Sequence, residues 1–210
     1  KNDYKKYPRN LKKDLKILKR LKVNYVYIPT KKQIFNSKNP IIIRLSQKDK
    51  ILCAKYRKGH FEGVIDVMTR LVKKIKPAKI FMGEKDFQQF ILVKRFIEKN
   101  FQSKIILCKT IRNKNKLALS SRNLHLSKNA LIVAEKISRN LISFKKQISQ
   151  QPLKKKKILS KKNELTKKFH IDIEYFEVRD INNLLISKKM DNSKIFIAYY
   201  LNKIRLIDNF

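Results

Sequence analysis

The chain of 210 residues has no apolar run approaching the ~20 residues that a membrane-spanning helix needs. It opens on Lys-Asn-Asp-Tyr, without the basic flank and apolar stretch of a secretory signal. Only two cysteines occur, Cys53 and Cys108, at no metal-site spacing, and the apolar run that contains Cys108 favours a buried thiol. These absences predict a soluble, cytoplasmic protein in a reducing compartment, with no membrane partner.

Acidic residues are scarce as well: 16 Asp and Glu stand against 53 Lys and Arg, a formal net charge of +37. Such a charge invites a nucleic-acid partner. The lysines, however, are spread along the whole chain, with one short cluster at 154–157 and no base-reading motif. With 3 Gly, 5 Pro and no Trp, the composition is what a genome rich in A and T produces. We therefore favour solvated basic faces and no specific nucleic acid; binding that survives moderate salt would favour the alternative.

The hydrophobic content of 42% is ordinary for a folded protein, and its periodicity predicts alternating helices and strands in the first part of the chain. This order implies a parallel sheet with crossover helices, in which ligands bind beyond the carboxyl ends of the strands. Gly83 and the stretch after Ile111 lie at such ends. The predicted helices follow Asn10 and cover 64–75 and 87–99, and the predicted strands cover 23–28, 41–43, 79–82 and 104–111.

The pattern changes past Arg122. Ser127 can cap a helix, a second helix is expected near 153–168, and three short apolar runs then have the character of antiparallel strands. We therefore predict an α/β protein with a parallel-sheet domain over 1–118 and a small α+β domain over 119–210. The three predicted strands of the second domain cover 171–179, 195–200 and 204–207.

The segment 81–89 reads as a strand that runs into Gly83, a charged turn and an amphipathic helix. A glycine there lets a backbone approach a ligand closely, and Lys85 would place a compact positive charge beside a polyphosphate. Asp86 and Gln89 have the spacing of a capping box, which would only satisfy free amides at the helix start. The spacing leaves capping and ligand binding equally open for Gln89.

The segment 117–123 places Ser120, Ser121 and Arg122 in a polar turn. Two hydroxyls and a planar guanidinium suit phosphate oxygens, although an ordinary turn with an exposed arginine is the alternative. His60 follows a basic, glycine-containing loop that can receive an anion, but a packing role is slightly favoured. No nucleophile–base arrangement, carboxylate pair or metal-ligand spacing is visible. The chemistry indicated is the positioning and charge neutralisation of a nucleotide.

Five blocks of this sequence closely resemble the pantoate–β-alanine ligase family, in family order and over the whole chain. The resemblance implies a Rossmann-like nucleotide-binding domain, incomplete at its start, and a smaller lid domain. It also implies ligation of pantoate to β-alanine through a pantoyl adenylate, with ATP consumed to AMP and pyrophosphate. The blocks are 3–9, 59–64, 81–89, 117–123 and 205–209.

The resemblance also implies roles for individual residues. Lys85 would stabilise the adenylation transition state, and Gln89 would hold pantoate. Mg²⁺ would be bound mainly by phosphate oxygens and water, with no protein ligand. Family members are usually homodimers. The residues expected to contact ATP are Gly83, Glu84, Lys85, Asp86, Ile111, Leu119, Ser120, Ser121 and Arg122.

The chain also departs from the family pattern. The family's opening His-x-Gly-His signature and a substrate-binding glutamine near it do not occur here. We therefore expect an amino-terminally truncated fragment that is inactive by itself. Lys58 stands where a proline is usual and Lys116 where a glycine is usual. A different adenylate-forming enzyme, a basic nucleic-acid-binding protein and an inert remnant of the same scaffold are the alternatives.

Overall fold

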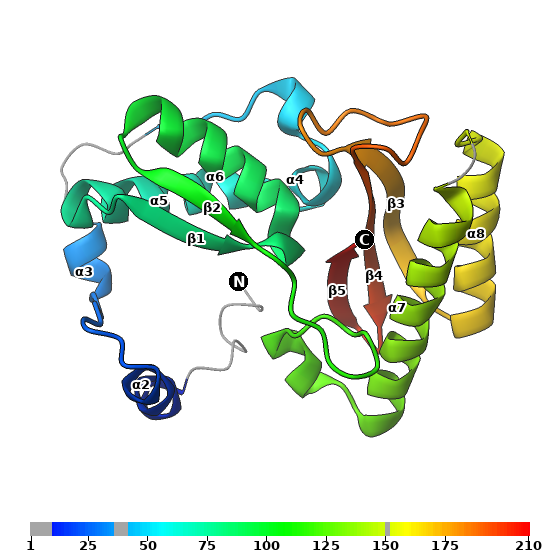
Figure 1. Cartoon of the computed structure of the whole chain (residues 1–210), viewed down its shortest axis with the longest axis horizontal. Helices are drawn as coiled ribbons and strands as arrows, with labels where there is room; N and C mark the ends of the chain where they lie inside the picture. The colour runs from blue at the N-terminus through cyan, green and yellow to red at the C-terminus, as the bar shows by residue number, and fades with distance from the viewer. Residues whose placement is uncertain (1–9, 36–41, 150–151) are drawn as a thin grey trace. The chain divides into compact units, whose positions relative to one another are not determined.

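A computed structural model describes residues 10–35, 42–149 and 152–210, and the chain divides into two compact units, 1–40 and 41–210 (Figure 1). In the first unit, helix α2 (Leu11–Arg20) begins after Asn10, whose Oδ1 accepts a hydrogen bond from the Lys13 amide at 3.0 Å. The predicted cap is thereby confirmed. Helix α3 (Lys31–Ile34) begins with a capping box formed by Thr30 and Gln33.

Two predicted strands are wrong. Residues 23–28 form no strand, and their large side chains are exposed. A strand is stable only when a neighbour pairs with it, and no strand in the described part of the chain does so. Ile42 and Ile43 are likewise outside any strand, while Ile41 lies outside the described residues.

The first half of the second unit is the predicted α/β arrangement. Strands β1 (Lys79–Gly83) and β2 (Lys104–Cys108) pair in parallel, and α6 (Phe87–Asn100) connects them. Helix α5 (His60–Ile75) precedes β1, after the short helix α4 (Leu52–Tyr56). The 3-10 turns η1 (Gln47–Asp49) and η2 (Glu84–Asp86) precede α4 and α6.

Strand β2 ends three residues before the predicted limit of 111, because its partner β1 stops at Gly83. Beyond that point the backbone finds other partners: the Thr110 amide donates to the Glu84 carboxylate, and the Ile111 carbonyl accepts from the Leu119 amide. The predicted burial of Cys108 is also wrong, because this last residue of β2 is exposed, whereas Cys53 is buried.

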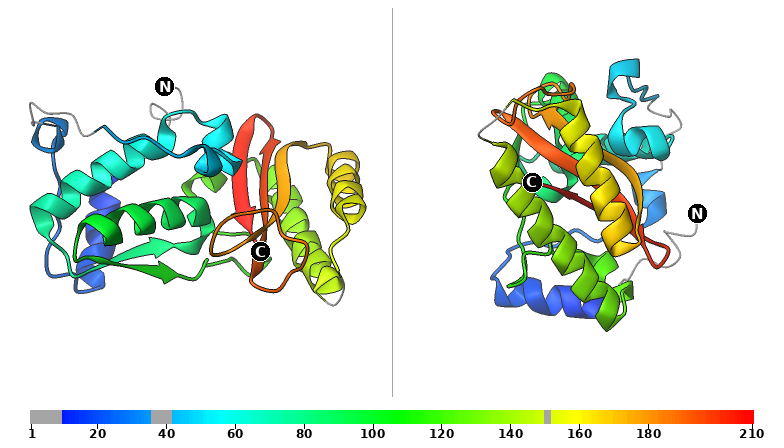
Figure 2. Two further views of the ribbon diagram at one scale, coloured as in Figure 1. Left: turned by 90° about the horizontal axis from the view of Figure 1, so that it is seen from above. Right: turned by 90° about the vertical axis from the view of Figure 1, so that its right-hand side faces the viewer.

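The second half confirms the predicted antiparallel sheet. Strands β3 (Asp172–Asp180), β4 (Ser193–Leu201) and β5 (Ile204–Asn209) pair in the order β3-β4-β5. The 3-10 turn η3 (Ser121–His125) leads to α7 (Lys128–Ile148), which Ser127 caps as predicted, and α8 (Lys155–Phe169) follows. Figure 2 shows α7 and α8 along one face of this sheet.

Strand β4 is buried on both faces. Ile195 and Ile197 belong to the apolar core beneath α7 and α8, while Phe196 and Ala198 belong to a second core with residues of α4 and α6. Because side chains alternate along a strand, one strand thereby supplies a wall to each core. The rings of Phe87 and Phe196, 5.9 Å apart, contribute to the second of these cores. The predicted domain boundary between 118 and 119 stays a prediction.

Nine non-glycine residues in the described part of the chain adopt positive φ angles, although only one glycine does. Two of them, Asn202 (φ 48°) and Lys203 (φ 63°), form the two-residue turn between β4 and β5. Tight hairpins of this type require left-handed conformations at both positions, where asparagine is tolerated and lysine is strained. The scarcity of glycine thus leaves ordinary side chains in unfavourable conformations. The other non-glycine residues with positive φ angles are Lys22, Leu52, Lys76, Lys116, His170, Leu184 and Asn192.

We predict that Lys203→Gly raises the free energy of unfolding by about 1 kcal/mol, because glycine adopts the left-handed region without a Cβ clash. Asn202→Gly in the same turn is the matched control and should change stability by only a few tenths of a kcal/mol, since asparagine already tolerates this region. Urea denaturation of both variants measures the difference. Equal effects of the two substitutions would contradict the interpretation.

Candidate active site

The carboxyl end of β1 opens onto empty space. Gly83 has an ordinary φ of −71°, and a Cβ built on it would meet no atom within 4 Å. Neither the backbone conformation nor the packing of this chain therefore requires a glycine there. The open space beside Gly83 leaves room for the close approach of a ligand, and the predicted ATP contact stays a prediction.

Lys85 follows in η2 and lines two neighbouring hollows of the surface. Its side chain is 19% exposed, and its ammonium lies 3.2 Å from a carboxylate oxygen of Asp86. The first hollow also contains Arg57, His60 and Gln89. Lys85 therefore presents a positive charge at the junction of the two hollows.

The capping box, one of the two alternatives that the sequence left open at the start of α6, is absent. Asp86 occupies the N-cap position but makes no side-chain capping hydrogen bond, so Gln89 is not held as its partner. The neighbouring Gln88 is instead the structural glutamine: it is buried and donates to the carbonyls of Asp49 (3.2 Å) and Ile51 (2.8 Å). Gln88 and Gln89 both line the first hollow, but only Gln88 is tied to the backbone through its side-chain amide.

The second hollow brings together the two segments that the sequence singled out. Lys85 from η2 and Ser120 and Arg122 from the polar turn line the same cavity, with Asp208 of β5. The Ser120 hydroxyl accepts from the Arg122 amide at 3.3 Å, and the Arg122 guanidinium donates to the Arg205 carbonyl at 3.4 Å. Ser121 is half-buried but does not line either hollow.

Ile111 and Leu119 form an exposed apolar pair outside the lining of both hollows. Their side chains are 67% and 56% exposed, and the Leu119 amide donates to the Ile111 carbonyl at 2.9 Å. Two adjacent exposed aliphatic side chains offer a surface on which a flat aromatic ring can lie.

Glu84 is already engaged within the protein. Its carboxylate accepts from the Lys194 ammonium at 2.8 Å and from the Thr110 amide at 3.2 Å. Burial alone would raise the pKa of Glu84, but these two hydrogen bonds hold the pKa below its usual value. The carboxylate therefore links the ends of β1 and β2 to β4, which makes Glu84 a structural residue as well as a predicted ATP contact.

His60 is the residue for which the sequence slightly favoured a packing role. It lies in the first hollow at the start of α5, half-buried, with its ring centroid 5.0 Å from that of Phe61. Burial lowers its pKa to about 4, and the nearby charges of Arg57 and Arg122 act in the same direction. The imidazole is therefore neutral near pH 7, with one nitrogen that accepts hydrogen bonds. The basic loop before it was the available signal.

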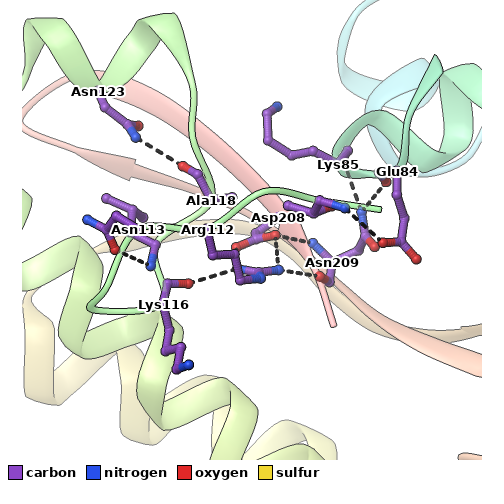
Figure 3. Close-up of polar contacts among 11 residues, drawn as sticks. Glu84, Lys85, Arg112, Asn113, Lys116, Ala118, Asn123, Asp208 and Asn209 are labelled. Carbon is purple, nitrogen blue, oxygen red and sulfur yellow. Dashed lines mark hydrogen bonds and ion pairs between the residues drawn. The ribbon is translucent and has the colours of Figure 1, made fainter. Parts of the chain in front are cut away.

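A partly buried ion pair beside the second hollow was not predicted (Figure 3). The Arg112 guanidinium makes two parallel hydrogen bonds to the Asp208 carboxylate, at 2.7 and 2.8 Å. Burial raises the pKa of Asp208, although Arg112 opposes this shift. The neighbouring Asn209 donates to the carbonyls of Glu84 and Lys85, at 2.8 and 3.0 Å. In the sequence, only the resemblance of the block 205–209 to the family pointed to Asp208 and Asn209.

Lys116, at the position where the family usually has glycine, adopts a left-handed φ of 73°. The loop thus keeps a backbone conformation that suits glycine, at the cost of strain in a lysine. Its carbonyl accepts from Arg112 at 3.0 Å. Lys116 therefore forms the turn that leads into Leu117 and the polar segment.

The comparisons with known proteins agree with this geometry. A family model described as Pantoate-beta-alanine ligase matches residues 1–210. The chain belongs to this family. Its fold is the family's α/β arrangement with a smaller, separate antiparallel sheet, which confirms the predicted fold class.

Several known proteins are similar in sequence to this chain over nearly its whole length. Pantothenate synthetase of Fervidobacterium nodosum is 31% identical over 209 residues, 99% of this chain and 75% of the relative. That of Francisella tularensis subsp. novicida is 35% identical over 213 residues, 100% of this chain and 72% of the relative.

Two solved structures are also similar. The crystal structure of the Thermus thermophilus pantothenate synthetase has a TM-score of 0.91 and 26% identity, covering 99% of this chain and 76% of that one. Pantoate-beta-alanine ligase from Francisella tularensis, complexed with beta-gamma ATP and beta-alanine, has a TM-score of 0.78 and 33% identity, covering 100% and 72%.

Two features are absent from the residues that the structure describes. No three His, Cys, Asp or Glu side chains within residues 10–35, 42–149 and 152–210 are grouped so that they could hold a metal ion. None of the helices in these ranges combines the length and the apolar character needed to cross a bilayer.

We predict that His60 titrates with a midpoint near pH 4 in the folded protein, below its usual value of 6.5. Because the unfolded chain then binds more protons between these values, the free energy of unfolding should decrease as the pH falls from 6.5 towards 4. Proton NMR follows the imidazole, and His60→Gln assigns its signal and should flatten this part of the stability profile. A midpoint near 6.5 would contradict the buried, cation-flanked environment.

Proposed function

We propose that this protein is a pantoate–β-alanine ligase, which uses ATP to activate pantoate as a pantoyl adenylate and then joins it to β-alanine. Pantothenate, AMP and pyrophosphate would be the products. The single observation that carries the proposal is the second hollow, where Lys85 and the Ser120–Arg122 corner meet. Family membership and the likeness to a ligase complexed with beta-gamma ATP and beta-alanine support it.

The triphosphate would lie in the second hollow. Its negative oxygens match the Lys85 ammonium, the Arg122 guanidinium and the Ser120 hydroxyl, which all donate hydrogen bonds. Because Lys85 lies at the junction of the hollows, it would also be close to the phosphate that reacts. A cation there lowers the barrier most when charge builds up on the leaving pyrophosphate. Ser121 would contribute from the edge of the same turn.

The nucleoside would extend past the open end of β1. Gly83 leaves room for it, and Ile111 and Leu119 would pack against the base. Glu84 and Asp86 would contribute through the η2 backbone, since the Glu84 carboxylate is occupied and the Asp86 carboxylate pairs with Lys85. Mg²⁺, held by phosphate oxygens and water, would neutralise part of the triphosphate charge. The donors of the second hollow fit a metal-bound triphosphate, because they are cationic or hydroxyl groups.

Pantoate would occupy the first hollow, which is partly open to solvent and is lined by His60, Lys85 and Gln89. Gln89 would hold it there through its amide. In the first step a pantoate carboxylate oxygen bonds to the α-phosphorus, and the bond to pyrophosphate breaks. The β-alanine nitrogen then attacks the activated carbonyl carbon, and AMP leaves. His60, neutral at pH 7, can accept a hydrogen bond from a hydroxyl or amine of these substrates.

The decisive experiment measures pantoate-dependent exchange of pyrophosphate into ATP, with the protein as its gene encodes it. Exchange should require pantoate, and AMP should accumulate only after β-alanine is added. Exchange with another carboxylic acid in place of pantoate would favour a different adenylate-forming enzyme. No exchange with any acid would remove the proposal. The homodimer and the domain boundary between 118 and 119 remain predictions.

We predict that Lys85→Ala slows this exchange by roughly two to three orders of magnitude, because a charge that stabilises the transition state is lost. The fold should survive, since the Lys85 side chain reaches the surface and forms its ion pair with its own neighbour, Asp86. Lys79→Ala is the matched control: it removes an exposed lysine from the other end of β1. Unchanged exchange in Lys85→Ala would exclude this lysine from the mechanism.

A further inference from the structure

The proposed phosphate site has two halves, Lys85 in η2 and the turn Ser120–Arg122, and hydrogen bonds to the end of β5 connect them. Lys85 lies in a turn of only three residues, η2, which has no side-chain cap of its own. The Ser120–Arg122 corner follows a loop that is outside both sheets. Both segments are short 3-10 turns outside the sheets, so contacts with other parts of the fold must fix the distance between them.

Asn209 fixes the turn that carries Lys85. It is 3% exposed, and its Nδ2 donates to the carbonyls of both Glu84 and Lys85, at 2.8 and 3.0 Å (Figure 3). The amide of one side chain thereby uses both of its donors on the two residues that begin η2. Without it, two backbone carbonyls of the turn would lose these hydrogen bonds.

Arg112 fixes the loop that leads to the other half of the site. Its Nη1 donates to the Lys116 carbonyl (3.0 Å) and to Asp208 (2.7 Å), and its Nη2 donates to Asp208 (2.8 Å) and to the Asn209 carbonyl (2.9 Å). Each of these nitrogens carries two hydrogens, so all four terminal N–H groups have partners within the protein. Arg112 therefore has no terminal donor left for a phosphate, although it lies next to the site.

Asp208 joins these two attachments. Its two carboxylate oxygens accept hydrogen bonds from the Arg112 guanidinium, and Oδ1 also accepts from the backbone N–H of Asn209 at 2.8 Å. The Asp208 side chain lines both hollows. The ring of Phe210 lies 4.6 Å from the Arg112 guanidinium and covers its face. The C-terminal end of β5 is thus connected to both halves of the phosphate site.

We propose that Arg112, Asp208 and Asn209 are positioning residues that set the separation of Lys85 from the Ser120–Arg122 corner. This inference rests on the proposed function. A flexible triphosphate can bind to two cationic groups over a range of separations, but the transfer step requires a fixed geometry. Loosening the three residues should therefore slow the reaction more than it weakens ATP binding.

Arg112→Lys tests the proposal, because it keeps the charge and removes the planar fork. We expect kcat to fall by about 10- to 100-fold, the effect of a displacement of about 1 Å, while KM for ATP changes by less than about threefold. Arg95→Lys is the matched control: Arg95 also bridges a carboxylate, Asp49, and a backbone carbonyl, that of Asn182. It should alter stability and leave kcat unchanged.

A double-mutant cycle separates positioning from general stability. If Arg112 acts through Lys85, adding Arg112→Lys to Lys85→Ala should reduce kcat by less than about twofold more. If the two substitutions reduce kcat additively, or if folded Arg112→Lys keeps its kcat, the positioning role is overturned while the proposed function stands. If Arg112→Lys does not fold, Asn209→Ala takes its place with the same expected outcomes. Absence of pantoate-dependent exchange in the unaltered protein would instead overturn the proposed function.

Discussion

The paired hydrogen bonds between Arg112 and Asp208 hold together the part of the molecule where chemistry is expected. Asp208 is buried and Arg112 is partly exposed, so removal of Arg112 would leave a buried carboxylate without its cation. The pair also has consequences beyond its own energy. Through Asn209 and the Lys116 carbonyl it connects the end of β1, the loop after β2 and the end of β5. Three segments far apart in the sequence thereby meet at one place.

The large positive charge of the chain does not by itself make the site. Of the 53 basic residues, only Arg57, Lys85 and Arg122 line the two hollows within the described residues. What distinguishes them is their placement in concave surface, where water screens a charge less than on an open face. The acidic groups nearby, Asp86 and Asp208, are both paired with cations. The net positive charge is thus a property of the whole chain, whereas the charge of the site comes from a few basic residues.

Local patterns in the sequence predicted the helices α2, α5, α6, α7 and α8 and the parallel or antiparallel character of each sheet, but not the short helices α3 and α4. The 3.6-residue period of α5 and α6 and the cap at Ser127 are properties of neighbouring residues, and all three are present, although α5 begins at His60 and not at residue 64. The wrong strand at 23–28 and the overlong β2 have a common reason: a strand depends on a partner that its own residues do not specify. Pairing, unlike periodicity, is a property of the fold.

The site shows the same limit. The strand–glycine–turn pattern and the Ser-Ser-Arg turn could be read locally, and the fold brings Lys85, Ser120 and Arg122 to one hollow. Arg112 and Asp208, however, are separated by 96 positions, and nothing in either neighbourhood indicates the other. Likewise, only the fold shows that the Gln88 amide donates to backbone carbonyls of the segment before α4, while Gln89 lines the first hollow.

The double burial of β4 has a consequence for how the unit 41–210 can come apart. A protease cut in the connection between Cys108 and Leu117 would not release two self-sufficient pieces. The amino-terminal piece would lose Phe196 and Ala198 from its core and expose Phe87, and the other piece would present these apolar side chains to water. Nicked protein should therefore stay associated until denaturant melts both cores together.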